Sequence, residues 1–455
     1  MTSSDTAARF LEHPYVLDLF AGPGGLDVAA HVLDVPSLGI EWDKDACETR
    51  YAAGLPTWHA DVSAVRRERF HELPGELNVL AGGPPCQTYS VAGSGAGRQA
   101  LDEVKKLIRA LVDGAGEEEV DEKLEKLGSD PRTALVLEPL RYAIKALGCP
   151  NREGRPFDVI VLEQVPAVKA LWDVYKEALQ IGLPRPSGAL VRYKVADVKT
   201  LPTEAYGVPQ TRRRTILIAR LEEYGTPALP RRTHHAYNPH RPQQGGPEDV
   251  KAVAQAVQAA LPMEGVEAPP RPWVSMGEVL GATEQRPDGR KPPFEIVSNY
   301  GSGGDPKKRG VRTSTQPSFT VTGKVSRNAV RHPDGTPHTP DRMTIPEAGI
   351  LQTFPPNYPW SGGDKSQQVG NAVPPLFGMH VLAAALALPL PPEEKLREDW
   401  PNAADEERAT LRKEGCGAPD GCGPNCPRPE VQSLPSPSSG SSRPRTGASA
   451  KRSAK

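Results

Sequence analysis

The chain has 455 residues, 37% of them hydrophobic, which is enough for a sizeable core and more than one domain. Lys and Arg (55) balance Asp and Glu (56), which excludes a uniformly basic surface, so any nucleic-acid binding would need local basic patches. Six cysteines are too few for a disulfide framework, and the longest apolar run, Val381 to Leu390, is shorter than the ~18 residues of a membrane span.

Residues 14–220 alternate short apolar runs with helical patterns. This alternation predicts an α/β fold with a doubly wound, mostly parallel sheet. Asp45–Ala53 and Thr133–Leu147 have the periodicity of connecting helices. The predicted strands are Val16–Phe20, Leu38–Glu41, Leu77–Ala81, Phe157–Leu162, Arg192–Val195 and Thr215–Ala219.

The alternation stops in the second half of the chain. Residues 221–341 are rich in Pro, Gly, His and Arg, and they predict a smaller, irregular second domain. Helical patterns return at Ile345–Gln352 and Pro375–Leu388, so residues 342–392 are expected to return to the first domain. Residues 393–455 are polar and become Pro/Ser/Arg-rich, which predicts a largely disordered tail.

An acidic, helix-prone stretch at residues 101–129 stands apart from the strand and helix pattern around it. Its mixed charges predict a solvated helical hairpin. The alternative is a segment that docks a partner or regulates the protein.

The first motif with chemical meaning is the glycine-rich turn DLFAGPGGLD, which directly follows the first predicted strand. Gly22 and Gly24 allow a tight turn and a close approach of the backbone to a ligand, and Phe20 offers an apolar wall. A dinucleotide fingerprint would need a third glycine where this chain has Asp27, so a nicotinamide cofactor is disfavoured.

The end of the second predicted strand adds polar and aromatic groups to this turn. Glu41 is placed to accept hydrogen bonds from ribose hydroxyls, and Trp42 can stack on an adenine ring. Asp61, further along, can reach an adenine amine. This combination favours S-adenosylmethionine, whereas the alternative is a strand-to-helix turn whose glycines serve packing alone.

Three further positions suit chemistry on a substrate. Cys86, in GGPPCQTYS, has a backbone fixed by two prolines and precedes a glycine-rich stretch, which suits a nucleophile under a mobile loop; the alternative is an inert thiol. Glu163 ends an apolar strand, where a carboxyl can act as an acid. Arg212 and Arg214 alternate along a strand start and share one face. Taken alone, each of these charged residues could equally be ion-paired or solvated.

In chain order, these motifs resemble the DNA (cytosine-5)-methyltransferase family of the prokaryotic type. The resemblance continues in RMTIPEAGILQTFP (Arg342–Pro355) and QVGNAVPP (Gln368–Pro375), and it covers roughly residues 14–220 and 342–385. It implies a Rossmann-like, S-adenosylmethionine-dependent methyltransferase domain. Residues 221–341 would then be the target-recognition domain.

The resemblance also implies a role for each motif residue. Cys86 would add to C6 of a cytosine flipped out of the duplex, Glu163 would hold or protonate N3, and Arg214 would donate to O2 with Arg212 beside it. S-adenosylmethionine would supply the methyl group, and no metal is expected. The matching cofactor positions are Phe20, Gly22, Gly24, Glu41, Trp42, Asp61, Leu135, Asn371 and Ala372.

The chain departs from the family pattern in three places, one of which is residues 221–341, where no family block matches, as expected of a variable target-recognition region. The family's Glu-Asn-Val block reads Glu163-Gln164-Val165 here. The longer amide of Gln164 is expected to shift the strand contact that orients Glu163, while the acid itself is retained. The spacer between the cysteine loop and Arg132 is also longer than usual.

Double-stranded DNA is the partner that this resemblance implies. The short lead before Val16 predicts a prokaryotic modification enzyme, with or without a cognate restriction endonuclease that acts separately. The few cysteines and the short apolar runs predict a cytoplasmic protein without a membrane, and we expect a monomer. Basic residues in two stretches are expected to contact phosphates. They are Arg212, Arg213, Arg214, Arg220, Arg231, Arg232 and Arg241, and Lys307, Lys308, Arg309, Arg312, Lys324, Arg327 and Arg331.

Three alternatives remain open. An RNA (tRNA) cytosine-5 methyltransferase would share the fold, although the residues after Cys86 and the length of 221–341 favour DNA. A catalytically impaired DNA-binding homologue would share the motifs, but Cys86 and Glu163 are intact. A zinc site in the tail at Cys416, Cys422 and Cys426 would lack a fourth ligand.

Overall fold

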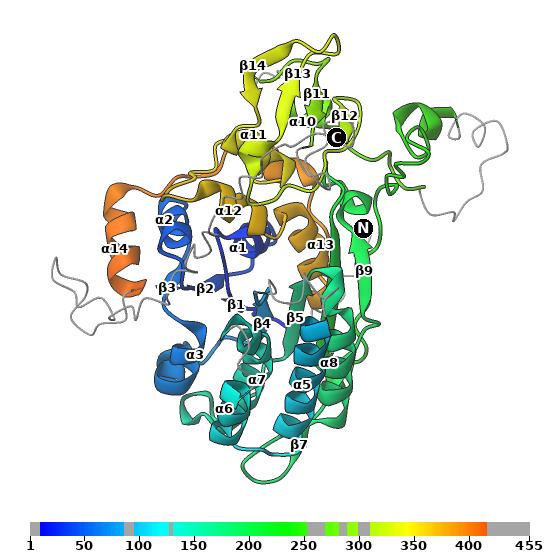
Figure 1. The fold of residues 1–455 in the computed structure, drawn as a ribbon. Coiled ribbons are helices and arrows are strands. Elements are labelled where there is room, and N and C mark those ends of the chain that lie inside the picture. Colours follow the sequence, from blue (N-terminus) through cyan, green and yellow to red (C-terminus); the bar gives the residue numbers. More distant parts are fainter. Residues whose placement is uncertain are drawn as a thin grey trace, which may run out of the picture.

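The computed structural model describes residues 10–85, 95–126, 131–252, 269–281, 289–298 and 310–415. At its centre is an eight-stranded sheet in the order β3-β2-β1-β4-β5-β10-β8, with β9 also paired to β10 (Figure 1). The first five strands in this order are parallel, and β10 runs antiparallel to its neighbours, which confirms the predicted mostly parallel α/β sheet. The strands are β1 (Val16–Leu19), β2 (Ser37–Glu41), β3 (Thr57–His59), β4 (Val79–Gly82), β5 (Val159–Gln164), β8 (Tyr193–Val195), β9 (Lys199–Pro202) and β10 (Arg213–Leu221).

Helices cover both faces of this sheet, because its strands carry apolar side chains on both sides. In β1, Leu17 and Leu19 belong to one buried cluster and Val16 to the other, as the two-residue period of a strand requires. The first cluster is closed by α3 (Val62–Ala64), α5 (Gly95–Val112), α7 (Glu138–Gly148) and α8 (Lys169–Ile181). The second is closed mainly by α1 (Gly25–Val32) and α13 (Pro375–Leu386), and α2 (Lys44–Ala52) packs on β3.

Close packing of α1 against α13 depends on the glycine-rich turn. Gly24, at φ 103°, caps α1 in a left-handed conformation that a side chain would strain. A Cβ on Gly25 would lie 2.1 Å from the Val373 carbonyl oxygen, which excludes any larger residue without a backbone shift. These glycines therefore bring residues near 373 up to the carboxyl end of β1.

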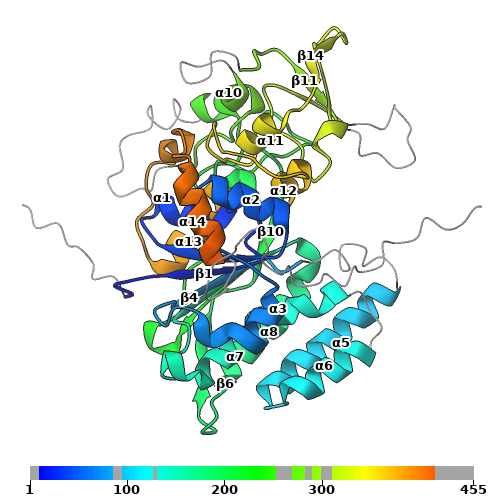
Figure 2. The ribbon, with the colours of Figure 1, turned by 90° about the vertical axis from the view of Figure 1, so that its left-hand side faces the viewer.

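The predicted hairpin at residues 101–129 is present as α5 and α6 (Glu117–Lys126) (Figure 2). It is not simply solvated, because Leu107, Ile108 and Val120 are buried in the core shared with α7 and α8. Apolar side chains at helical spacing on α5 account for this packing, since they face α8 while the charged side chains face water.

Residues 221–341 contain more regular structure than their composition predicts. A four-stranded antiparallel sheet in the order β12-β11-β13-β14 packs with three short helices around its own apolar core (Figure 1). The elements of this smaller body are α10 (Met276–Leu280), β11 (Glu295–Val297), β12 (Val311–Thr313), β13 (Ala329–Arg331) and β14 (Pro337–Arg342). From the segment that follows it, α11 (Ile345–Leu351) and α12 (Lys365–Asn371) add side chains to its core.

Several predicted boundaries are wrong. The helix expected from Thr133 starts as a 3-10 turn and becomes α-helical only at Glu138. The tail expected to be disordered from residue 393 contains α14 (Asp405–Gly415), which packs on α2 and β3. A short hairpin of β6 (Leu183–Pro184) and β7 (Leu190–Val191) was not expected.

One helical stretch in the described part of the chain, Lys365–Leu386, is long and apolar enough to cross a membrane. However, 83% of its most apolar window is buried inside the fold. That burial is the behaviour of a core helix, so this stretch is weak evidence for a membrane span.

A buried ion pair joins α1 to α2 beneath the glycine-rich turn. The Asp27 carboxylate accepts a hydrogen bond from Arg50 Nη1 at 2.6 Å, and neither side chain is exposed. Arg50 also donates to Thr57 Oγ1 at 2.8 Å, and Ser37 Oγ donates to Asp27 at 2.8 Å. The guanidinium passes so close to Gly39 that a Cβ there would lie 2.0 Å from Nη2. The acidic residue found in place of a third glycine is thus an anchor for α2.

Replacing Arg50 with Met should lower the free energy of unfolding by about 3–5 kcal/mol, because the Asp27 carboxylate would stay buried without its partner. Urea unfolding followed by circular dichroism measures this loss. Arg109→Met, which breaks an exposed pair with Glu177, should cost less than about 1 kcal/mol. Equal losses in the two variants would contradict the assignment of Arg50 as an anchor.

Candidate active site

A cavity of about 630 Å³ lies at the carboxyl ends of β1, β2, β4 and β5, where ligands bind to open α/β sheets. It gathers nearly all of the predicted site residues: Phe20, Gly22, Glu41, Trp42, Asp61, Leu135, Glu163, Arg212, Arg214, Asn371 and Ala372. Gly24 does not line it and instead caps α1. Cys86 lies outside the described residues, but Gly83 and Pro85, which lead to it, line the cavity.

Glu41 ties the glycine-rich turn to the end of β2. Its carboxylate accepts the Gly22 backbone N–H at 2.7 Å and the Asp43 backbone N–H at 2.7 Å. Burial raises the pKa of Glu41, and these two hydrogen bonds oppose that shift. Each carboxylate oxygen can still accept a second hydrogen bond, so Glu41 both shapes the turn and keeps acceptors for a ligand.

Two aromatic side chains flank Glu41 in unusual states. Trp42 is 52% exposed although it lines the cavity, which leaves a large apolar surface without a protein partner. Phe20 has φ 62°, a left-handed conformation that is costly for a bulky residue and is found mostly at functional sites. Asp61 caps α3 by accepting the Ala64 N–H at 2.8 Å, and its second oxygen is not used by that bond. This wall suits an apolar ring that carries polar substituents.

Asp18 is a cavity residue that the sequence analysis missed. It lies within β1 and is 2% exposed. Burial, and secondarily the neighbouring Asp27, raise its pKa well above the usual range, which favours a protonated Asp18. The signal was present in the sequence, since Asp18 is the one charged residue in an apolar strand directly before the glycine-rich turn.

Glu163 and Arg214 form an ion pair on the other side of the cavity. Arg214 Nε lies 2.6 Å from Glu163 Oε1, and both side chains are largely buried. Glu163 is the next-to-last residue of β5 and Arg214 is the second residue of β10. The antiparallel register pairs Glu163 with Ile216, so Arg214, two positions earlier in β10, lies diagonally across from Glu163 on the same face of the sheet. The pair places a carboxylate and a guanidinium beside the loop that leads to Cys86.

Gln164, the departure from the family pattern, links the end of β5 to the loop that follows β4. Its amide nitrogen donates to the carbonyl of Pro84, and its amide oxygen accepts the Val165 N–H at 2.5 Å. Pro84 stands two positions before Cys86 in the chain. The longer amide therefore holds the end of β5 to the start of the cysteine loop.

Arg212 lines the cavity, but its terminal nitrogens are occupied. Nη1 donates to the carbonyls of Val321 and Gly370 at 3.1 Å each, and Nη2 donates to that of Ala372 at 3.1 Å. Gln210 works alongside it by donating to Leu351 and accepting the Val321 N–H. Arg212 thus joins the start of β10 to the smaller body and to the cavity wall before α13.

The predicted basic patches need a correction. Arg212, Arg220 and Arg312 are each 9% exposed or less, so they cannot contact DNA phosphates. Arg220 donates to two carbonyls at the end of α13, and Arg312 lies over the ring of Tyr237. Their positive charge serves internal carbonyls and aromatic rings instead. Exposed members of the two patches include Arg241, Lys324 and Arg327, while Lys307, Lys308 and Arg309 lie outside the described residues.

Comparison with known proteins places these motifs in context. A family model for C-5 cytosine-specific DNA methylase matches residues 15–112 and 189–386. The chain is 25% identical over 388 residues to Type II methyltransferase M1.HphI of Haemophilus parahaemolyticus, covering 82% of this chain and 86% of that protein. It is 25% identical to Type II methyltransferase M.Eco47II of Escherichia coli over 374 residues, 79% of this chain and 75% of that one.

The chain also matches a solved structure, at a lower sequence identity than these relatives. The S. pombe Dnmt2 methyltransferase is matched at 14% identity with a TM-score of 0.46, over 82% of this chain and 99% of that one. At this level the likeness carries no argument of its own. The sequence matches are therefore the basis for placing the chain in a family.

Replacing Arg212 with Met should remove the donor that Arg212 provides to three backbone carbonyls, and it should lower the free energy of unfolding by about 3 kcal/mol. Arg212→Lys should lower the free energy of unfolding by less, because the lysine ammonium can still reach one of these carbonyls. Urea unfolding gives both values, with the exposed Arg327→Met as a control expected within about 0.5 kcal/mol of the unmodified chain. Unchanged stability in Arg212→Met would show that this junction is dispensable.

Proposed function

The chain belongs to the C-5 cytosine-specific DNA methylase family, and we propose that it transfers a methyl group from S-adenosylmethionine to C5 of cytosine in a specific duplex DNA sequence. The observation that carries this proposal is the Glu163–Arg214 pair beside the start of the cysteine loop, in the same cavity as Glu41 and Trp42. One cavity thus offers one wall for a cofactor and another for a base.

The cofactor wall fits an adenosyl group. The exposed ring of Trp42 can stack on adenine, Glu41 can accept from ribose hydroxyls, and the free oxygen of Asp61 can accept from the adenine amine. Leu135, Asn371 and Ala372 close this side of the cavity. When bound there, S-adenosylmethionine supplies an electrophilic methyl group.

The opposite wall suits activation of cytosine. C5 is a poor nucleophile, so the Cys86 thiolate adds to C6, and Glu163 holds N3 as negative charge develops on the ring. Arg214 donates to O2 while it stays paired with Glu163. Loss of the C5 proton after methylation releases Cys86. Arg212 acts as a positioning residue, because its terminal nitrogens already bind backbone carbonyls.

The smaller body would select the DNA sequence that is methylated. We assign residues 221–341 to target recognition, and residues 342–392 link this body to the catalytic domain. Lys324 and Arg327 are exposed there and can meet phosphates, while the base must leave the duplex to reach the cavity. DNA is favoured over transfer RNA by the family match and by the Type II relatives. Those relatives support a prokaryotic modification role. We further propose that this chain acts as a monomer and that any cognate endonuclease acts separately.

Glu41→Ala should raise the dissociation constant for S-adenosylmethionine about 10- to 100-fold, because it removes charged acceptors and frees the Gly22 turn. Affinity for duplex DNA should stay nearly unchanged. Calorimetry with the cofactor measures the effect, and Glu48→Ala on α2 is the control, since Glu48 pairs with Arg412 outside the cavity. Wild-type cofactor affinity in Glu41→Ala would refute the assignment.

DNA with 5-fluorocytosine at the target should trap the covalent intermediate, because fluorine cannot leave as a proton does. The adduct should require S-adenosylmethionine and survive denaturing electrophoresis. It should vanish in Cys86→Ala, persist in Cys149→Ala, and form far more slowly in Glu163→Gln, whose amide cannot deliver a proton to N3.

Methylation of cytosine by the Cys86→Ala protein would overturn this mechanism while leaving the family intact. Bisulfite sequencing of DNA from cells that express the protein provides the independent readout of the activity itself. An inert but DNA-binding homologue would give neither adduct nor methylation.

A further inference from the structure

The cavity at the carboxyl ends of the strands is acidic on its cofactor side. The carboxyl groups that line this side are those of Asp18, Glu41, Asp43, Asp61 and Asp364. In the described part of the chain, the cations that line the cavity belong to its substrate side, where Arg212 binds backbone carbonyls and Arg214 is paired with Glu163. The cofactor side therefore favours an occupant that carries positive charge.

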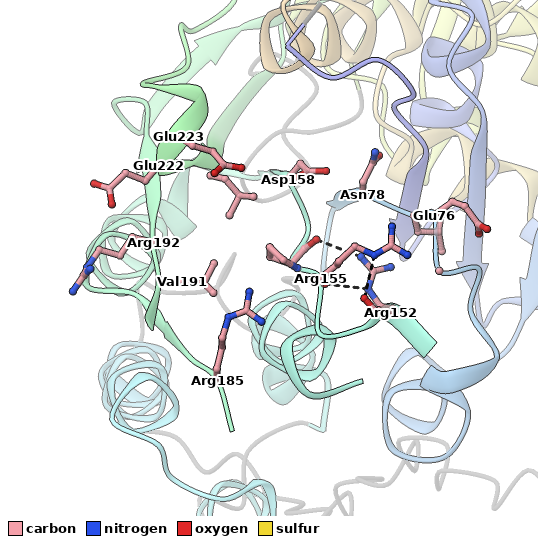
Figure 3. A pocket seen from close by; sticks show the side chains of 14 residues that line it. Glu76, Asn78, Arg152, Arg155, Asp158, Arg185, Val191, Arg192, Glu222 and Glu223 are labelled. Carbon is pink, nitrogen blue, oxygen red and sulfur yellow. Dashed lines mark hydrogen bonds between the residues drawn. The ribbon is translucent and has the colours of Figure 1, made fainter. Parts of the chain in front are cut away.

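A second cavity, of about 430 Å³, has a different balance of charge (Figure 3). Its carboxylates and guanidiniums surround the same space in equal numbers. They are Glu76, Asp158, Glu222 and Glu223 against Arg152, Arg155, Arg185 and Arg192. The excess of carboxyl groups on the cofactor side is thus a property of that site and not of every cavity in this fold.

Asp18 is the most deeply buried carboxyl group of the cofactor side. It is 2% exposed and lies on β1, on the same face as Val16, where α1 and α13 cover the sheet. Asp27 of α1 is its neighbour and is 1% exposed. Two buried carboxyl groups therefore lie together beneath the glycine-rich turn.

One guanidinium serves both of these carboxyl groups. Arg50 Nη1 and Nη2 donate to Asp27 at 2.6 and 3.1 Å, and Nε donates to Thr57 Oγ1 at 2.8 Å. Within the described part of the chain, Asp18 therefore shares a cation that is already bound to its neighbour. Two buried carboxylates beside one cation leave a net negative charge, which a proton on Asp18 removes when it is donated to Asp27.

The other titratable groups around Asp18 leave this proton as the one to be exchanged. Burial and then Asp27 raise the pKa of Asp18 well above its usual range, Arg50 opposes them, and Glu41 adds to the rise. The charge of Glu41 is itself held by two backbone N–H groups. Tyr358, which is near Arg50, donates its hydroxyl to the Pro23 carbonyl, and burial raises its pKa, so it stays neutral.

We propose that Asp18 is the charge-sensing group of the cofactor site, which releases its proton to solvent when S-adenosylmethionine binds and regains one after methyl transfer. This inference rests on the cofactor assignment proposed above. The sulfonium brings one positive charge close to a buried carboxyl group, where water screens it weakly, so it favours the ionised form of Asp18 through space and without contact. The O–H bond of Asp18 then breaks, and the proton passes to water.

The same group distinguishes the cofactor from the product that it leaves. S-Adenosylhomocysteine is a neutral thioether in place of a sulfonium, so Asp18 takes up a proton from water again. The product then lacks the attraction between opposite charges that held the cofactor. Asp18 thus favours exchange of the product for a new cofactor molecule.

Calorimetry on the full chain, in two buffers that differ in ionisation enthalpy, counts the protons exchanged for each bound ligand. Between about pH 6 and pH 7 the amino groups of both ligands stay largely protonated. S-Adenosylmethionine should release up to about one proton there, and S-adenosylhomocysteine close to none. Because proton release favours binding at higher pH, the dissociation constant of S-adenosylmethionine should fall by up to about tenfold per pH unit, and that of the product should stay constant.

Asp18→Asn should abolish the proton release and weaken S-adenosylmethionine about tenfold, while S-adenosylhomocysteine stays within about twofold. The amide has the shape of the protonated acid and can donate to Asp27 in the same way, so the variant should fold. Asp34→Asn is the matched control. Asp34 is exposed in the loop between α1 and β2, at a φ of 56° that Asn tolerates, and the variant should keep the full proton release.

The role of Asp18 is refuted if S-adenosylmethionine binds without proton release, if S-adenosylhomocysteine releases as many protons, or if Asp18→Asn retains the release. Infrared difference spectra of the unmodified chain provide a test without any variant, since the band of a protonated carboxyl group should disappear when S-adenosylmethionine binds. A band that persists would overturn the proposal. Binding without proton release would leave the cofactor assignment intact, whereas an absence of S-adenosylmethionine binding would overturn both.

Discussion

The guanidinium of Arg212 donates hydrogen bonds to backbone carbonyls in two stretches of chain that are far apart in sequence. Val321 belongs to the smaller body, and Gly370 and Ala372 form the wall of the cavity before α13. Because the guanidinium is planar and its donors have fixed directions, it sets the spacing between these carbonyls. Arg214 lies two positions further along the same strand. Arg212, together with Gln210, therefore fixes the position of the smaller body relative to the substrate side of the cavity.

Three buried ion pairs likewise join elements of the fold. Asp27 and Arg50 join α1 to α2, Arg66 and Glu138 join the segment after α3 to α7, and Arg290 holds Glu347 at the start of α11. Such pairs need not add stability over an apolar contact, because both partners must be desolvated. These ion pairs do make a different placement of the helices energetically unfavourable, since a shifted helix would leave a buried charge without its partner. A site in which several side chains converge requires that the helices and strands carrying them hold fixed positions.

Strongly patterned parts of the fold could be predicted from the sequence. The strands β1, β2, β4, β5, β8 and β10 were all expected, within a few residues of their observed bounds. β3 and β9 were not, because three or four residues with polar members show no clear two-residue period. The antiparallel sheet of the smaller body was missed for the same reason, since its strands are short and rich in Pro, Arg and Thr. Their pairing comes from partners distant in the chain.

The sequence by itself determined which residues stand at the ends of the parallel strands, and parallel strands end at a common edge, so Phe20, Glu41 and Glu163 had to meet there. It did not determine what each arginine does. Only the tertiary structure decided that Arg214 faces Glu163 while Arg212 binds carbonyls near 321 and 371. The physical reason is that a buried guanidinium takes its role from its acceptors. These lie 51 positions away for Arg214 and more than a hundred positions away for Arg212, beyond the range of any local sequence pattern.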